Sequence, residues 1–267
     1  MRKVILSLAV LGMVAAPLSA AHAEDGNDVS IALNHTKIER GDKITVSGHV
    51  DGPTKDRRVR IGASLGEDAG IDEQFHGYPK IQSGTHNYSV TFTVKRGGTY
   101  VFYADVLDSG GGTTTSMLAT SDLLRVYRWT SLDQDKYYSG GAFSTVPDGT
   151  AGTTSGKKIA GRSYDHEFFV RDGGTLGFDN FPEVCNSFKG YFGVADNSKN
   201  GSKAHYDIVL PATAITHAAT HGSKAKLQRA PIAAGTTGIS VHATFNEPES
   251  SKNRLIVAEP RIHCAIR

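Results

Sequence analysis

Tyrosines and hydrogen-bonding side chains gather in the second half of the sequence. Three tyrosines, with four polar residues in predicted loops, form this set: Tyr137, Tyr138, Tyr164, Asp165, His166, Asp196 and Asn197. Saccharide sites combine an aromatic ring, which stacks on the apolar side of a pyranose, with a few polar groups that bond hydroxyls. The set is therefore a candidate ligand-binding site for a sugar.

Each of these residues also has a purely structural interpretation. Tyr164 fits a core or corner tyrosine. Asp196 and Asn197 fit a turn, because short polar side chains satisfy backbone groups there. Both interpretations stay open on the sequence alone.

Sequence signatures of a metal site or of a catalytic site are weaker than those of the candidate sugar site. Asp196, Asn197 and Asn200 offer oxygen ligands of the kind that calcium takes, but their spacing matches no EF-hand loop. His217 and His221 are four residues apart, which suits zinc on a helix, whereas this segment is predicted to be β-structure. The sequence has no His-Glu-x-x-His pattern and no phosphate-binding loop. We expect no metal, no cofactor and no catalytic residues.

The first residues are typical of a secretory signal peptide. Arg2 and Lys3 precede an apolar run from Val4 to Ala16, and Ala21-His22-Ala23 places small residues where signal peptidase cleaves. The run is shorter than the roughly 20 residues that a membrane-spanning helix needs. We expect a signal peptide at residues 1–23, a mature chain from Glu24, and a secreted, extracellular protein without membrane insertion.

The predicted leader also carries the excess charge of the chain. The whole sequence has 29 Lys and Arg residues and 27 Asp and Glu residues. Loss of Arg2 and Lys3 makes the two numbers equal, so the mature chain has a formal net charge of zero. A neutral chain lacks the general attraction that draws basic proteins to nucleic acid or anionic lipid. We expect no nucleic-acid partner.

Residues 24–127 contain short runs in which apolar and polar residues alternate. The alternating apolar residues are Val29, Ile31, Leu33, Ile44, Val46, Val59, Ile61, Tyr88, Val90, Phe92, Val94, Tyr100, Phe102, Ala104, Leu124 and Val126. Period-two alternation buries one face of each strand, and several such strands predict a β-sandwich. Ser64 to Gln82 is predicted to be a loop. The phrases "RGDKITVSGHV" and "RGGTYVFYADV" resemble bacterial immunoglobulin-like modules.

Residues 128–267 carry more specific phrases. They run in the order "WTSLDQ", "KKIAGRSYDHEFFV", "CNSFKGYFGVADNSKNGSKAHYDIVL", "GISVHATF" and "EPRIHC". In this order and spacing they resemble the NPCBM family, modules attached to many secreted glycoside hydrolases. The resemblance implies a galactose-binding-like jelly roll that binds carbohydrate without catalysis. The chain departs from the family pattern at Glu167, where a glycine is usual, and at Asp196-Asn197, where two aspartates are usual.

Cys185 and Cys264 are the two cysteines of the chain. Two cysteines in an exported protein most often form one disulfide. One begins a predicted strand and the other ends a predicted strand, as neighbouring antiparallel strands would allow. We expect a bridge between them.

The sequence as a whole predicts an all-β chain, with an Ig-like β-sandwich followed by a jelly-roll β-sandwich. The Ig-like alternation ends at Val126 and the second domain opens at Trp129, which leaves no flexible tether. We therefore expect the domains to pack together, with Trp129 or Leu132 partly buried. The first functional hypothesis is a secreted, non-catalytic protein that binds a polysaccharide or cell-surface glycan. The alternative, motivated by the departures from the family pattern, is an extracellular protein–protein adhesion or assembly module without a sugar site.

Overall fold

The computed structural model describes residues 29–52, 54–55, 57–66, 73–107, 119–132, 137–138, 141–142, 144–147, 151–182, 184–247 and 252–266. The predicted signal peptide and the predicted start at Glu24 lie outside these residues. The described part of the chain contains no helix long and apolar enough to cross a membrane. It consists of strands and their connections, which confirms the predicted all-β class.

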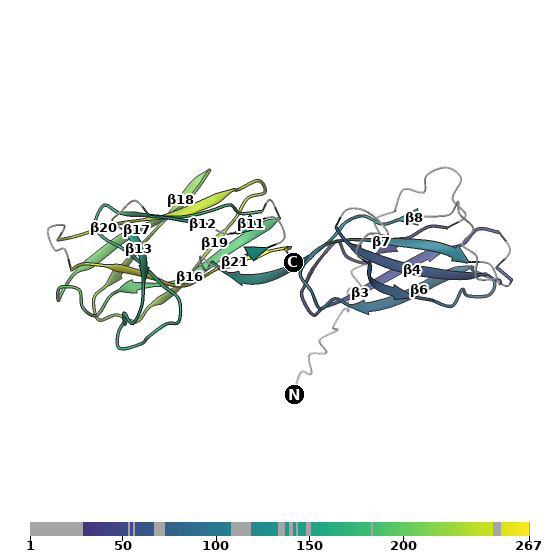
Figure 1. The fold of residues 1–267 in the computed structure, drawn as a ribbon, viewed down its shortest axis with the longest axis horizontal. Coiled ribbons are helices and arrows are strands. Elements are labelled where there is room, and N and C mark those ends of the chain that lie inside the picture. Colours follow the sequence, from purple (N-terminus) through teal and green to yellow (C-terminus); the bar gives the residue numbers. More distant parts are fainter. Residues whose placement is uncertain are drawn as a thin grey trace, which may run out of the picture.

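The strands form two β-sandwiches placed end to end (Figure 1). One sheet of the first sandwich has the order β1–β3–β6, and the facing sheet has the order β9–β7–β4–β5, with β8 on β7 and β2 parallel to β9. The bounds are β1 (Ala32–Leu33), β2 (Lys37–Glu39), β3 (Lys43–His49), β4 (Arg58–Leu65), β5 (Glu73–Gly77), β6 (Asn87–Thr93), β7 (Gly98–Leu107), β8 (Ala119–Thr120) and β9 (Leu124–Ser131).

In the second sandwich, one sheet has the order β13–β14–β21–β16–β19 and the other has the order β12–β15–β20–β17–β18. A separate ribbon pairs β10 (Tyr137–Tyr138) with β11 (Gly141–Ala142). The other bounds are β12 (Ser144–Pro147), β13 (Ala151–Thr154), β14 (Glu167–Val170), β15 (Thr175–Asp179), β16 (Cys185–Val194), β17 (Lys203–Leu210), β18 (Thr213–Thr220), β19 (Lys226–Pro231), β20 (Gly238–Phe245) and β21 (Leu255–Cys264).

Each sandwich has its own apolar core. In the first, alternating residues of facing strands, such as Ile44 of β3 and Phe102 of β7, are fully buried. In the second, aromatic rings fill the space between the sheets: Phe192 stacks on Tyr206 at a centroid distance of 5.0 Å, and Phe168 meets Phe178 edge to face at 5.4 Å. The inward residues are those that the period-two alternation selects.

The prediction of a loop from Ser64 to Gln82 is wrong in part. Strand β5 lies inside this segment and pairs with β4 at the edge of its sheet. Phe75 of β5 packs its ring 5.8 Å from those of Phe92 and Tyr100. Glycine and acidic residues obscure the strand in the sequence, whereas the single aromatic side chain fixes it to the core.

The predicted disulfide is confirmed. Cys185 opens β16 and Cys264 ends β21, and the two residues are direct cross-strand partners with Cα atoms 4.0 Å apart. Both cysteines are buried at one end of the second core. The bridge therefore joins two neighbouring strands that are 79 residues apart in the sequence.

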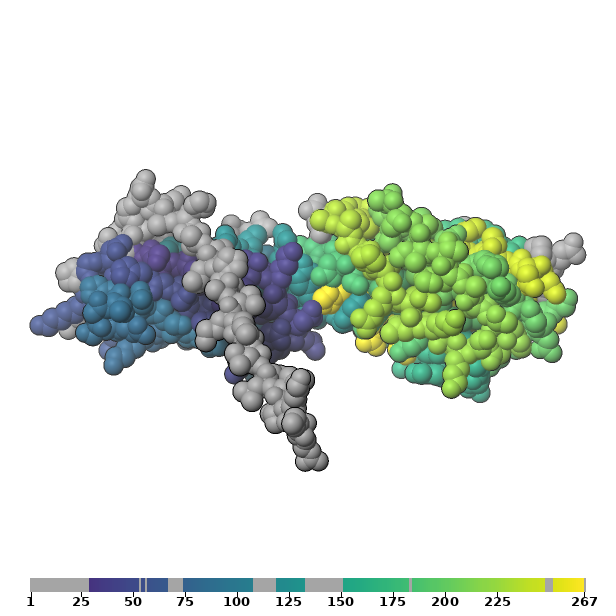
Figure 2. Space-filling view, turned by 180° about the vertical axis from the view of Figure 1, so that it is seen from behind, coloured from purple at the N-terminus to yellow at the C-terminus, as the bar shows by residue number. Residues whose placement is uncertain are grey.

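Strand β9 belongs to both sandwiches. Its first residues pair with β7, from Tyr100↔Leu124 to Gly98↔Val126, and its last residues pair with β21, from Cys264↔Arg128 to Arg261↔Ser131. The backbones of the two halves also approach closely here. A Cβ atom added to Gly97 would lie only 2.5 Å from the carbonyl oxygen of Ile266. Figure 2 shows the teal and yellow atoms of these segments where the two halves meet.

An aromatic cluster fills the junction. The ring of His263, on β21, lies 4.8 Å from Trp129 and 5.1 Å from Tyr127. Its Nε2 donates to Oε2 of Glu39 in the first sandwich (2.9 Å), and its Nδ1 contacts Oδ1 of Asn186 in the second (2.7 Å). His263 is buried and Trp129 is half-buried, so these rings join the sandwiches, as the short connection predicted.

Candidate functional site

The connection between β13 and β14 lies against one face of the second sandwich. Ile159 and Tyr164 from this connection are buried on Ala195, Ile256 and Ala258, in a small cluster separate from the main core. Apolar side chains thus hold the segment on the outer face of the sheet that contains β16 and β21.

Two carboxylates fix the same connection through its backbone. Glu167 is buried and accepts from the N–H groups of Lys157 (3.0 Å) and Tyr164 (3.3 Å). Asp196 accepts from the N–H groups of Ala160 (2.6 Å) and Gly161 (2.7 Å). Hydrogen bonds to ionised acceptors are stronger than those between neutral groups, so the segment is held at both ends.

Between these two clamps, Arg162 lies over two tyrosine rings. Its guanidinium carbon is 4.9 Å from the ring centroid of Tyr164 and 5.6 Å from that of Tyr191, and the two rings are 5.7 Å apart. Burial raises the pKa of Tyr164, against the lowering effect of the Arg162 charge. Arg162 itself is exposed and Tyr191 is half-buried.

Glu259 completes this group. It lies at a bulge in β21 and has a φ of 46°, a left-handed conformation that is costly for a residue with a side chain. Its N–H donates to the carbonyl of His166 (2.8 Å), and its Oε2 lies 3.7 Å from Nη2 of Arg261. Bulges redirect side chains and are frequent beside functional sites. We call Arg162, Tyr164, Tyr191 and Glu259 the arginine–tyrosine face.

The structure brings four of the seven sequence-predicted residues together near this face. Tyr164, Asp165 and His166 are consecutive, and Asp196 is bonded to the same connection. Tyr164 is only 9% exposed because its ring packs under Arg162, which fits the interpretation of Tyr164 as a core or corner tyrosine. Asp165 and His166 are exposed.

The other three predicted residues lie elsewhere. Asn197 is exposed in the turn that follows β16. Tyr137 and Tyr138 form β10, and their side chains lie outside the described part of the chain.

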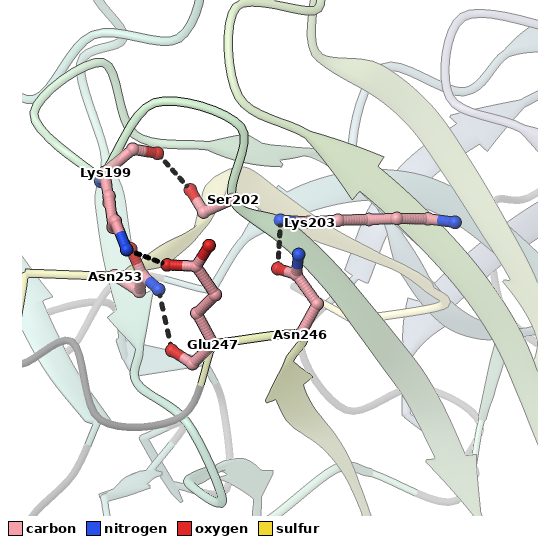
Figure 3. A network of polar contacts seen from close by, with 6 residues as sticks. All are labelled: Lys199, Ser202, Lys203, Asn246, Glu247 and Asn253. Atoms are coloured by element: carbon pink, nitrogen blue, oxygen red, sulfur yellow. Dashed lines mark hydrogen bonds and ion pairs between the residues drawn. The ribbon is translucent and has the colours of Figure 1, made fainter.

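A polar network anchors the turn that contains Asn197 (Figure 3). Lys199 contacts the carboxylate of Glu247, and its N–H donates to Asn253 Oδ1 (3.2 Å). Ser202 Oγ donates to the carbonyl of Lys199 (2.7 Å), and Asn253 Nδ2 donates to the carbonyl of Glu247 (3.1 Å). These contacts give the loop a structural role in joining β16 to the end of β20.

The sequence analysis missed Arg162, Tyr191 and Glu259. The alternation of β16 was a usable signal for Tyr191, because Phe188 and Phe192 point into the core and Tyr191, next to Phe192 in the strand, must then point outward. Arg162 and Glu259 left no such pattern, since a loop and a bulge bring them together.

The described residues give no metal cluster of three or more His, Cys, Asp or Glu side chains. Residues Gly62 to Gly66 match the Gly-x-Ser-x-Gly pattern of esterases in sequence. In esterases this serine stands on a sharp turn between a strand and a helix. Ser64 instead lies within β4 and is fully buried.

We expect Asp196→Ala to loosen the connection that carries Arg162. Loss of two hydrogen bonds from a charged acceptor should lower the free energy of unfolding by about 1–2 kcal/mol, a range reduced for the exposure of Asp196. Trypsin should cut faster after Lys157, Lys158 or Arg162. Asp165→Ala removes an exposed carboxylate from the same segment and is the matched control. Equal digestion rates for both variants would show that Asp196 does not hold this connection in place.

No family model and no curated protein matches the sequence. Solved structures that align with this chain include carbohydrate-binding modules. The tandem CBM51 modules of Sp3GH98 from Streptococcus pneumoniae SP3-BS71 give a TM-score of 0.40 at 9% identity, over 88% of this chain and 83% of that one. The M60 catalytic domain with CBM51-1 and CBM51-2 of Clostridium perfringens ZmpB gives 0.40 at 10% identity, over 85% and 34%.

A third structure, CBM51-2 of the same ZmpB in complex with GlcNAc and joined to INT domains, gives a TM-score of 0.39 at 10% identity, over 88% of this chain and 48% of that one. This chain spans about a third to a half of the three ZmpB chains that it matches.

Proposed function

We propose that the chain is a secreted, non-catalytic protein that binds a polysaccharide or cell-surface glycan through the arginine–tyrosine face of its second sandwich. The arrangement of Arg162 over Tyr164 and Tyr191, beside Glu259, carries this proposal. In the same proposal, residues 24–127 form an Ig-like domain, residues 128–267 form an NPCBM-like jelly roll, and residues 1–23 are removed on export.

The chemistry of the face suits sugar hydroxyls, each of which both donates and accepts a hydrogen bond. The guanidinium of Arg162 supplies donors in a fixed planar geometry, and the carboxylate of Glu259 supplies acceptors. The half-buried ring of Tyr191 adds an apolar surface next to them. A donor, an acceptor and an aromatic ring therefore meet in one patch.

The face is also held in place before any ligand arrives. Asp196 and Glu167 fix the backbone on either side of Arg162, and the two rings support its guanidinium. Binding then costs little ordering of side chains, which favours affinity. Because the oxygens of Asp196 and Glu167 already accept backbone N–H groups, these carboxylates serve the scaffold, and we assign the face no bond-breaking step.

The test is binding to soluble and insoluble polysaccharides, together with a glycan array, using the mature protein. On a glycan that the wild type retains, we expect Arg162→Ala and Tyr191→Ala each to weaken binding by about tenfold to a hundredfold, the cost of a lost charged hydrogen bond or ring contact. The two variants should remain folded, because Arg162 is exposed and Tyr191 is only half-buried.

Arg125→Ala is the matched control, since Arg125 is an exposed arginine of the first sandwich. It should bind like the wild type. Retention on no glycan would refute sugar binding, and equal affinities for Arg162→Ala and Arg125→Ala would place the site elsewhere.

A second candidate function, protein–protein adhesion or assembly, has one specific observation in its favour. Tyr78 of the first sandwich is 59% exposed and lines a hollow of about 580 Å³ with Ile81, Pro79 and several basic side chains. Exposed tyrosines are frequent anchors of protein interfaces. Tyr78→Ala should abolish such an interaction and leave glycan retention unchanged, so the two functions can be told apart.

A further inference from the structure

Three basic residues stand side by side on the same sheet face. Arg229 of β19 is the direct partner of Lys189 of β16, and Lys189 is the direct partner of Arg261 of β21. Directly paired residues of antiparallel strands project to the same side of a sheet. The adjacent Phe188 is fully buried in the core, so these three side chains point outward. We call Arg229, Lys189 and Arg261 the cation row.

The cation row is short and well defined. Neighbouring strands are about 4.8 Å apart, so the Cα atoms of its outer members lie roughly 10 Å from each other. Arg229 and Arg261 are exposed, and Lys189 is half-buried between them. The strands β16 and β21 that carry two of its members are bridged at Cys185–Cys264, which holds the row rigidly.

Like charges opposite each other destabilise a sheet, and the row carries this cost. Burial lowers the pKa of Lys189, and the charges of Arg261 and Arg229 lower it further. Within the described part of the chain, the ion pair of the row is the 3.7 Å contact of Arg261 with Glu259. Lys189 is supported by an aromatic ring instead, with its Nζ 3.8 Å from the ring centroid of Trp129. An anion placed over the row would relieve the repulsion.

The cation row continues into the arginine–tyrosine face. Tyr191 follows Lys189 by two residues on β16 and therefore points to the same side. Its cross-strand partner Leu227 is 42% exposed, which adds an apolar side chain to the surface. A ligand that spans both groups meets Arg162 and the three cations of the row, one carboxylate, an aromatic ring and a leucine.

We propose that the cation row binds the acidic groups of an anionic polysaccharide, whose sugar rings lie against Tyr191 and Leu227. This inference rests on the proposed function and names its ligand class: a saccharide chain that bears carboxylate, sulfate or phosphate groups at intervals. The combination of a short charged row with apolar side chains suits such a chain. Proteins that bind nucleic acid or anionic membranes usually do so through broad positive surfaces, whereas the mature chain has no net charge.

The experiment uses polygalacturonate and the same polymer after chemical reduction of its carboxyl groups to alcohols, with a sulfated and a phosphate-bearing polysaccharide beside them. Affinities are measured at two salt concentrations. We expect one of the anionic polymers to bind at least about tenfold more tightly than neutral polymer, and the affinity to fall as salt rises. The triple variant Arg229→Gln, Lys189→Gln and Arg261→Gln should bind that polymer about thirtyfold or more weakly.

The control variant changes the same number of charges on the first sandwich: Lys43→Gln, Lys95→Gln and Arg125→Gln, all at exposed positions. It should bind like the wild type. Arg229→Gln alone, on an edge strand, should fold normally and weaken binding about threefold to tenfold, so the test survives if the triple variant is unstable.

Equal affinities of the row and control variants would overturn the inference. Equal binding of the anionic and the carboxyl-reduced polymer would also overturn it, while leaving sugar binding intact. Loss of binding in Arg162→Ala but not in Arg229→Gln would support the proposed function and reject the row. Binding to duplex DNA or to phosphatidylserine vesicles as tightly as to any anionic polysaccharide, at equal salt, would reject the ligand class.

Discussion

Loss of the Cys185–Cys264 bridge is expected to lower the free energy of unfolding by about 4–5 kcal/mol, because the open chain regains the freedom of a loop of about 80 residues. For a chain of this size, the melting temperature should fall by roughly 10–15 °C. The bridge ties β16 to β21 at the end of the second core, so this sandwich should lose stability first. Calorimetry of the mature protein with and without a reductant measures the effect.

The double variant Cys185→Ala and Cys264→Ala separates the bridge from other effects of the reductant. It should melt at the temperature of the reduced wild type, and the reductant should not change it further. A double variant that melts within about a degree of the oxidised wild type would contradict the expected stabilisation.

Trp129→Ala should have the second largest effect, about 2–3 kcal/mol, because it removes a half-buried ring from the junction. The substitution ends the contact with Lys189 at 3.8 Å and the stack on His263 at 4.8 Å. With this link weakened, we expect two separate thermal transitions in place of the single transition that we expect of the wild type. Small-angle scattering should show a wider range of angles between the sandwiches.

Trp129→Phe keeps a ring over His263 and is the matched control for this experiment. It should preserve the single transition and most of the stability. If Trp129→Ala is as stable as the wild type and scatters identically, the aromatic cluster does not couple the two sandwiches.

Much of the fold follows from local patterns in the sequence. The alternation at Ile44–Val46 and Tyr100–Phe102 predicted strands that the structure contains, and the two cysteines predicted the bridge. Strand β5 was missed because one aromatic residue, Phe75, fixes it through contacts with rings that are distant in the sequence. A contact of this kind, between residues far apart in the sequence, produces no local alternation of apolar and polar residues.

The candidate site was predictable only in part. Tyr164 could be picked from its residue type, but its burial depends on Arg162, which lies over it, and on Tyr191 from a distant strand. To predict the cation row, one must know the register of three strands. To place Glu259 beside the tyrosines, one must also know of the bulge that shifts that register. Lys189 pairs with Arg229, 40 residues away, and with Arg261, 72 residues away, so the row is a property of the folded chain and not of any one segment.

Strand β9 has a further consequence for the order in which the protein is assembled. As the chain emerges N-terminus first, the first sandwich can close as soon as β9 has appeared, since β2 and β7 are already present. The second half of the same strand must then wait for β21, the last strand to be made. Until that moment the end of β9, residues 128–131, lacks its β21 partner, and an open strand edge of this kind can pair with other chains. More than a hundred further residues separate the end of β9 from β21, so this interval covers nearly the whole second sandwich.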